Sequence, residues 1–568
     1  MSAHALSLNP RLWILGPKRD LSLFVLSPLW IFPLIWMVRS HFDVNNLGAV
    51  VLAIGGVGHH LPGFIRAYTD PVLFRRYRSR FIAAPIFFLG VCAVFSGLHL
   101  HSLSLILILW GMWHGAMQVN GFLRIYDAKA GSISTATARL DWAMCLAWFG
   151  GGLLHSSNRL IALLYYFYGA GGALIAPEAF FLFRQVWDVF TVLITLLFFI
   201  NVWKQVRAGQ APNPLKFLTM ASSFAFWWFA MVGVENLLVG LVLFEMFHDV
   251  QYNALVWVYN QRRVSQGMTA SPLERLLFQP RVWRVAFYAL LILAYGYLGV
   301  VMGYSSVQAP DASKAGAAAA NFWTGMFAAS AFLHFYFDGF IWRVREAQFR
   351  QELGLEKKSR GSSGPQPVSS RWAPGWKWAF FAVPALLLGT VELHGSVSPA
   401  LSQYRNMARI APNRWPIHFA LALLEKSYGN YDAAAAQCEQ SLEIDPDAQV
   451  AHALLGDIYF HQGRQDLALG HYLRAASLDS TDYEVRDHLA TLLLMQDRVA
   501  EAIPHLYAVI GRKPEDANLH YLLGSALMHE GRVQEAVPYL RRTLELDPRY
   551  SDAAKYLAQA ESLLSGRK

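Results

Sequence analysis

The chain has 568 residues, enough for more than one domain. Hydrophobic residues make up 55% of it and charged residues only 15%, which excludes a highly charged disordered protein and favours a membrane protein. The net charge of +9 fits arginine-rich loops between hydrophobic segments, and because the sequence has no nucleic-acid-binding motif we expect no nucleic-acid partner.

Long apolar segments run through the first two thirds of the chain. About eleven of them approach the roughly 20 residues that a helix needs to cross the hydrocarbon core of a bilayer. In chain order they are 21–39, 47–65, 82–98, 103–124, 140–156, 184–203, 216–232, 236–259, 284–303, 321–343 and 376–394. A further apolar stretch, 160–176, is interrupted by the sequence GAGGA, and the sequence leaves open whether it crosses. We therefore predict an all-α polytopic membrane bundle.

Lysine and arginine residues predict the orientation of this bundle. They concentrate in the loops 66–81, 204–215, 260–283 and 343–375 and are rare in the opposite connections. Because positively charged loops stay in the cytoplasm, we expect a cytoplasmic N-terminus. The last span then carries the C-terminal region to the outer face, which in the inner membrane of a bacterium is the periplasm.

Composition also predicts the domain boundaries. The polar stretch 354–375 is rich in serine, glycine and proline and has no helical periodicity, so we predict a flexible linker there. The membrane bundle is expected over 1–353, the last transmembrane helix and its exit over 376–399, and a soluble helical domain over 400–568.

The soluble domain contains a repeat of 34 residues. Residues at repeat junctions and tight contacts recur at this interval: Pro446, Ser480, Pro514 and Pro548; Gly429, Gly463, Asp497 and Gly531; Ala422, Gly456, Ala490 and Gly524. This pattern resembles the tetratricopeptide repeat family over about 414–550, with 551–568 as a capping helix. The resemblance implies an α-solenoid of stacked helical hairpins whose concave face binds a protein partner.

Four predicted spans carry histidines deep inside them. Counted from the outer end of each span, these histidines lie about 11 to 13 residues in, or roughly 17–20 Å at 1.5 Å per residue. They are His59, His60, His114, His248 and His334. Ionisable groups within a bilayer cost about 2.5 kcal/mol or more each, so their shared depth indicates a functional site.

Polar side chains accompany these histidines at helical spacing. Glu245, His248, Asp249 and Tyr252 lie along one stripe of a helix, and Asp338 follows His334 by one turn. Imidazole and carboxylate groups without thiolate suit iron, zinc or copper, and we expect iron. We predict as metal ligands His59, His60, His114, His248, His334, Asp249 and Asp338, with His114, His248 and Asp249 as catalytic residues. The residues expected to orient these ligands or contact the substrate are Glu245, Gln118, Gln251, Tyr252, Arg66 and Arg124.

The leading functional hypothesis is an intramembrane metal-dependent oxidoreductase, of the oxygenase, hydroxylase or desaturase type. Its substrate would be a lipid or isoprenoid-like molecule, and its repeat domain would recruit a protein partner. Two alternatives remain open. The segment WGMWHG, Trp110–Gly115, resembles the tryptophan–histidine–glycine segment of membrane-bound O-acyltransferases, which implies His114 as a general base. A transporter or assembly scaffold with proton-relaying histidines is the non-enzymatic alternative.

Overall fold

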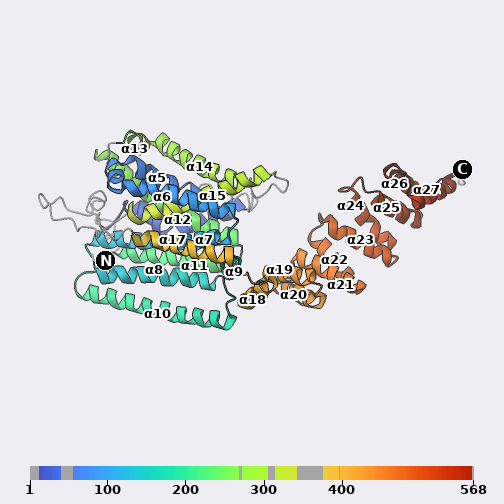
Figure 1. Cartoon of the computed structure of the whole chain (residues 1–568), viewed down its shortest axis with the longest axis horizontal. Helices are drawn as coiled ribbons and strands as arrows, with labels where there is room; N and C mark the ends of the chain where they lie inside the picture. The colour runs from blue at the N-terminus through green and yellow to red at the C-terminus, as the bar shows by residue number, and fades with distance from the viewer. Residues whose placement is uncertain are drawn as a thin grey trace. The chain divides into compact units, whose positions relative to one another are not determined.

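A computed structural model describes most of the chain. The described residues are 12–39, 56–132, 134–267, 271–279, 281–304, 314–341, 375–395 and 397–565. All regular secondary structure within these ranges is helical. The chain divides into two compact units, Met1–Ser398 and Pro399–Lys568 (Figure 1). Residues 354–374 of the predicted linker lie outside the described residues.

The first unit is a bundle of helices (Figure 1). Two π-helical turns, η1 and η3, continue neighbouring α-helices. The elements are α2 Pro17–Asp20, η1 Leu21–Val25, α3 Ser27–Arg39, α5 His60–Thr69, α6 Pro71–Gly97, α7 His101–Ala130, α8 Thr135–His155, α9 Ser157–Gly169, α10 Pro177–Arg207, α11 Pro214–Trp228, η3 Phe229–Gly233, α12 Leu237–Ser265, α13 Pro272–Leu277, α14 Val282–Tyr304, α15 Lys314–Ile341 and α17 Gly375–His394.

Polar side chains begin several of these helices. Asp70 accepts hydrogen bonds from the backbone N–H groups of Val72 and Leu73 and so caps the first turn of α6. The first turn of α7 is capped from another helix, because Glu392 of α17 accepts the backbone N–H groups of His101 and Ser102. This contact ties the last helix of the unit to α7, on which His114 lies.

The prediction of about eleven spans is wrong for the described residues. Four helical segments are long and apolar enough to cross a membrane: α6, α7, α10 and α11 with η3. The bent pair formed by α2 with η1 and α3, which meet at 53°, raises the number to five. Polar residues explain part of the difference, since Glu245, His248 and Asp249 interrupt the apolar sequence of α12. Part of the predicted span 47–65 lies outside the described residues.

Helix α10 lies at the edge of the bundle (Figure 1). Only 6% of its most apolar stretch is buried within the protein. Large apolar side chains, among them Leu193, Leu196 and Phe199, are more than half exposed. Water would disfavour such a surface, whereas the hydrocarbon of a bilayer would not, so this helix is suited to contact lipid.

A buried ion network connects α7, α8 and α11. Lys216 of α11 contacts Asp127 of α7 at 2.8 Å and Asp141 of α8 at 2.7 Å. Arg124 contacts the same two carboxylates at 2.7 and 3.3 Å. Two cations therefore face two anions, which offsets the cost of removing these charges from water. The network holds three helices of the bundle together.

The second unit consists of helical hairpins with a short preceding helix and a final capping helix. Its elements are α18 Ala400–Ile410, α19 Trp415–Ser427, α20 Tyr431–Ile444, α21 Gln449–His461, α22 Gln465–Leu478, α23 Tyr483–Met495, α24 Val499–Ile510, α25 Ala517–His529, α26 Val533–Leu546 and α27 Ser551–Ser565. Small residues permit the close contact within each hairpin. A Cβ atom on Gly456, for example, would lie only 2.8 Å from the ring of Tyr472.

The turn within each hairpin requires a left-handed backbone conformation. The recurring residues Gly429, Gly463 and Gly531 have φ angles of 79°, 72° and 71°, and Asp497 takes the same position with φ 60°. Glycine adopts this conformation without a steric penalty, whereas aspartate adopts it at a steric cost. The repeated small residue of the sequence pattern is thus explained by the backbone of the turn.

Candidate metal centre

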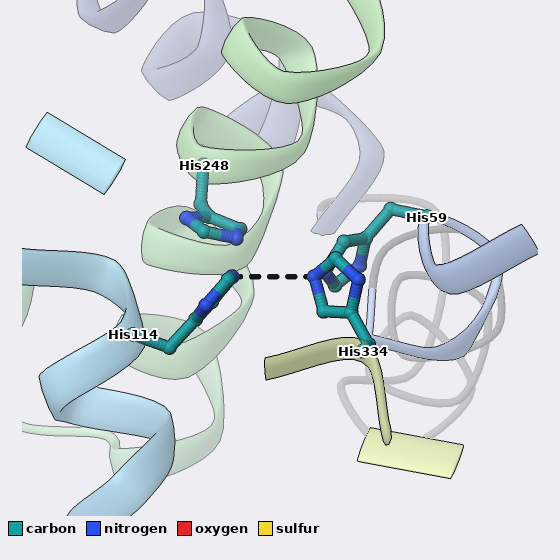
Figure 2. Close-up of side chains that lie close together, drawn as sticks. All are labelled: His59, His114, His248 and His334. Atoms are coloured by element: carbon teal, nitrogen blue, oxygen red, sulfur yellow. Dashed lines mark hydrogen bonds between the residues drawn. The ribbon is translucent and has the colours of Figure 1, made fainter. Parts of the chain in front are cut away.

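Four histidines from distant parts of the sequence converge inside the first unit. His59 immediately precedes α5, His114 lies in the middle of α7, His248 on α12 and His334 on α15. Figure 2 shows their rings directed toward one another. All four side chains are buried, and none of the residues is more than 8% exposed. The histidine cluster expected from the sequence is therefore present in the structure, and we use this name for these four residues.

The spacing within the histidine cluster suits a metal ion. One potential ligand atom from each of the four residues lies within 4.8 Å of all the others. The Nε2 atoms of His114 and His334 are 3.2 Å apart. Two imidazole nitrogens that each bind a tetrahedral zinc ion at about 2.0–2.1 Å would be separated by about 3.3 Å. The observed pair thus needs little movement to share an ion.

Asp249 supports the histidine cluster from one side. Its Oδ1 atom lies 3.0 Å from Nδ1 of His59, and both side chains are buried. A carboxylate that accepts the Nδ1 proton leaves the lone pair of Nε2 available as a ligand. At this distance the carboxylate of Asp249 could orient the ring of His59.

Asp338 lies near two of the four rings. Its Oδ2 atom is 3.6 Å from Nε2 of His334 and 4.0 Å from Nε2 of His114, and its Oδ1 atom accepts a hydrogen bond from the hydroxyl of Tyr252 at 3.1 Å. The carboxylate could add an oxygen ligand to the four nitrogens. On the other side of its ring, Nδ1 of His334 is buried without a hydrogen-bond partner in the described structure. Buried polar atoms without a partner are rare in folded proteins.

His60 differs from the other four histidines. It is buried and its ring stacks on that of His334 with the centroids 4.7 Å apart, but it does not belong to the group of converging ligand atoms. Its Nδ1 atom instead lies 2.9 Å from Oγ of Ser330, which is 3.0 Å from the hydroxyl of Tyr295. The sequence predicted it as a ligand because its position along the span matches that of the others.

The remaining predicted residues have different positions. Gln118 donates to the backbone carbonyl of His248 at 3.0 Å and so helps to fix this part of α12. Gln251 donates to the carbonyl of Phe24. Arg66 donates to the hydroxyl of Tyr259 at 2.7 Å, and Arg124 belongs to the buried ion network. Both arginines thus bind groups other than the four histidines.

Two cavities adjoin the histidine cluster, and His114 and Phe335 line both. The larger has a volume of about 330 Å³ and includes His59, His248 and Glu245 in its wall. The smaller, of about 200 Å³, includes Asp338, Tyr252 and Gln118. The larger volume falls within the range typical of small-molecule sites, about 300–1,000 Å³. A substrate in either cavity could reach the imidazoles.

Sequence reasoning missed Arg159, a buried cation in the wall of the larger cavity. It is the single charged residue of α9 and immediately precedes the apolar stretch 160–176, whose crossing the sequence left open. That helix has only 13 residues, fewer than a bilayer crossing requires. The single charge at the start of an apolar segment was the available signal, but it resembles ordinary interfacial anchoring.

The second unit has a polar cluster of its own, centred on Asp457. This carboxylate accepts hydrogen bonds from Lys426 at 2.8 Å and Tyr472 at 2.7 Å, and lies 3.1 Å from Nδ1 of His488. Burial alone would raise the pKa of Asp457, but these three partners together lower it below its ordinary value. The hydrogen bond to Asp457 raises the pKa of His488. The four side chains join helices of three successive hairpins.

Comparison with known proteins identifies the second unit only. The model of the tetratricopeptide repeat family matches residues 419–483 and 489–551, which confirms the repeats predicted from the 34-residue pattern. None of the curated proteins matches the chain. The first unit therefore has no assigned family.

Solved structures similar to the chain include other repeat proteins. "YrrB: a TPR protein with an unusual peptide-binding site" has 20% identity, covers 30% of this chain and 87% of its own, and gives a TM-score of 0.28. The MamA protein is 20% identical, and the match covers 27% of this chain and 84% of MamA with a TM-score of 0.24. MamA from Desulfovibrio magneticus RS-1 is 16% identical, and the match covers 27% of this chain and 97% of that protein with a TM-score of 0.23.

Proposed function

We propose that the first unit is a metal-dependent membrane enzyme that oxidises an apolar, lipid-like substrate. The observation that carries this proposal is the convergence of four buried imidazoles on one point. Neutral histidines in such number have no structural need to meet, and a shared ion explains why they do. Iron is the expected metal, with zinc and copper as alternatives.

Different residues of the site would have different roles in the reaction. The histidine cluster holds the metal, Asp249 keeps Nε2 of His59 unprotonated, and Asp338 lies near enough to take up or deliver a proton close to the reacting atoms. Apolar walls of the larger cavity exclude water and accept a hydrocarbon substrate. Bound iron would supply dioxygen activation, with electrons from a separate donor.

The repeat unit supports a second part of the proposal. Tetratricopeptide repeats suggest a protein-interaction domain, and we propose that this one recruits a protein partner to the membrane enzyme. The arginine-rich loops favour an inner-membrane protein with a cytoplasmic N-terminus and periplasmic repeats. Attaching a membrane-impermeant label to a cysteine introduced at the exposed residue Ser562 of α27 would test this side assignment.

Metal analysis of the purified full-length protein tests the enzyme proposal. We expect near-stoichiometric iron in the wild-type protein, and its loss in His248→Ala and His334→Ala. His488→Ala, in the repeat unit, is the matched control and should keep the metal. Protein that remains metal-free after incubation with iron, zinc and copper would overturn the proposal.

The acyltransferase alternative has one observation in its favour. His114 lines both cavities, so its ring could contact a donor in one cavity and an acceptor in the other. An enzyme of this kind would use His114 as a general base and would need no metal. Turnover of acyl-coenzyme A that is lost in His114→Ala but kept in His248→Ala, by a metal-free protein, would favour it.

A further inference from the structure

The larger cavity contains a charge that the proposed chemistry does not use. Arg159 is 8% exposed and lies in the cavity wall, together with Glu245 and the histidine cluster. Much of the remaining wall is apolar, with Leu107, Ile108, Leu237, Leu241, Phe244 and Phe327 among its residues. A cation in such surroundings is costly unless an acceptor group compensates it.

The protein satisfies only one end of the Arg159 side chain. Nη1 donates to the backbone carbonyl of Met231 at 2.9 Å and lies 3.4 Å from Oγ of Ser156. Nη2 is buried and has no hydrogen-bond partner in the described part of the structure. Glu245 shares the cavity, yet no ion pair within 4.0 Å joins it to Arg159 among the described residues. One nitrogen with two N–H groups is thus left to bind a ligand.

The backbone beside Arg159 leaves room for this arrangement. A Cβ atom on Gly240 would lie 2.5 Å from Nη2 and 2.3 Å from the carbonyl oxygen of Ala230. Any larger residue at this position would therefore push the guanidinium away or separate α12 from η3. Glycine allows the cation to lie against α12 at the wall of the cavity.

We infer that the larger cavity binds an amphiphile with a carboxylate head and an apolar body. A carboxylate oxygen accepts the hydrogen bond from Nη2 of Arg159, and the apolar body lies along the walls and reaches the histidine cluster. A single available nitrogen suits one carboxylate oxygen better than a phosphate, which takes several donors. The amphiphile would be the substrate of the proposed enzyme, and in that respect the inference rests on the proposed function. Binding itself does not require the metal.

Binding of decanoate to the full-length protein in lipid nanodiscs tests this inference. Radiolabelled decanoate is displaced by unlabelled decanoate, methyl decanoate or decanol. We expect the acid to bind about tenfold or more tightly than the ester, because a charge-assisted hydrogen bond is lost with the ester. The preference should shrink in Arg159→Lys and vanish in Arg159→Gln, while the affinity for the ester stays the same in all three proteins.

The controls separate this inference from the proposed enzyme. Gel filtration and the melting temperature establish that Arg159→Gln is folded, and unchanged binding of the ester shows that its cavity is intact. His248→Ala should still prefer the acid, since Arg159 is unaltered. Equal affinities of acid and ester in the wild-type protein, or an acid preference that persists in Arg159→Gln, would overturn the inference whatever the metal content is. A metal-free protein that binds the acid through Arg159 would overturn the enzyme proposal alone.

Discussion

Replacing Asp249 by asparagine would test how the histidine cluster is held. His59 Nδ1 lies 3.0 Å from Asp249 Oδ1, and the two side chains are only 3% and 7% exposed. A carboxylate accepts the Nδ1 proton and so keeps Nε2 free to bind a metal. Asparagine has nearly the same shape but no charge, so the change opens no cavity. Its effect should therefore fall on the ligand and leave the packing intact.

The size of the effect follows from the contact between Asp249 and Nδ1 of His59. Loss of such a partner weakens metal binding about 10- to 100-fold, which corresponds to about 1.4–2.7 kcal/mol. Because all four imidazoles remain, Asp249→Asn should still bind one ion per chain at saturating metal. His59→Ala removes a ligand itself and should weaken binding further than Asp249→Asn does.

Competition between the purified protein and a chelator of known affinity measures this difference. The titration gives both the dissociation constant and the number of ions bound per chain, for the wild type and for each variant. An unchanged dissociation constant in Asp249→Asn would show that the carboxylate does not orient His59. Complete loss of binding at saturating metal would show that Asp249 is itself a ligand. Either result would refute the reasoning.

Three further predictions concern residues outside the histidine cluster. His60→Asn should keep its metal in elemental analysis, because His60 contacts Ser330 and lies outside the converging atoms; loss of the ion would place it among the ligands. Asp497→Gly should stabilise the protein in urea denaturation by about 0.5–1 kcal/mol, because φ is 60° there; a loss of stability would contradict this. The hydrogen bond to Asp457 raises the pKa of His488, so protonated His488 stabilises the repeat unit. This contribution is complete at a pH below the ordinary pKa of 6.5 and is lost as the pH rises through the raised pKa. Melting curves recorded across this range should show that loss in the wild type, and an equal loss in His488→Gln would exclude the histidine as its cause.

The repeat unit was the most predictable part of the chain. Its 34-residue period is a local signal, because each hairpin needs a small residue at the same contact and a left-handed residue at the same turn. Asp497 shows the limit of that signal. An aspartate does not by itself predict a φ of 60°. Only the alignment of Asp497 with Gly429, Gly463 and Gly531 indicates this conformation.

The meeting of several histidines was predictable, but the direction of each ring was not. Counting residues along each span placed five histidines in one layer, and the structure brings four of them together. His60 was expected in the same layer, but α5 begins at this residue, and its Nδ1 atom contacts Ser330 of α15. Rotation about a helix axis depends on tertiary packing, which a single sequence does not reveal. For the same reason, the position of Arg159 in a cavity wall could not be foreseen.

The number of membrane-crossing helices was the least predictable feature. An apolar run of suitable length also occurs in buried helices, so length and composition alone count too many spans. Helix α12 illustrates the difficulty. Its polar stripe makes it less apolar than a typical membrane-crossing helix, although many of its residues are buried in the bundle.

The ion network of Arg124, Asp127, Asp141 and Lys216 has a consequence for biogenesis. In a bilayer, a solitary aspartate or lysine on a freshly inserted helix costs about 2.5–3.5 kcal/mol. Arg124 and Asp127 of α7 pair on their own helix, whereas Asp141 of α8 and Lys216 of α11 find their counter-charges only on other helices. Until α11 has been inserted, two carboxylates share the single cation Arg124, so the charges of the network balance only once all three helices are in place.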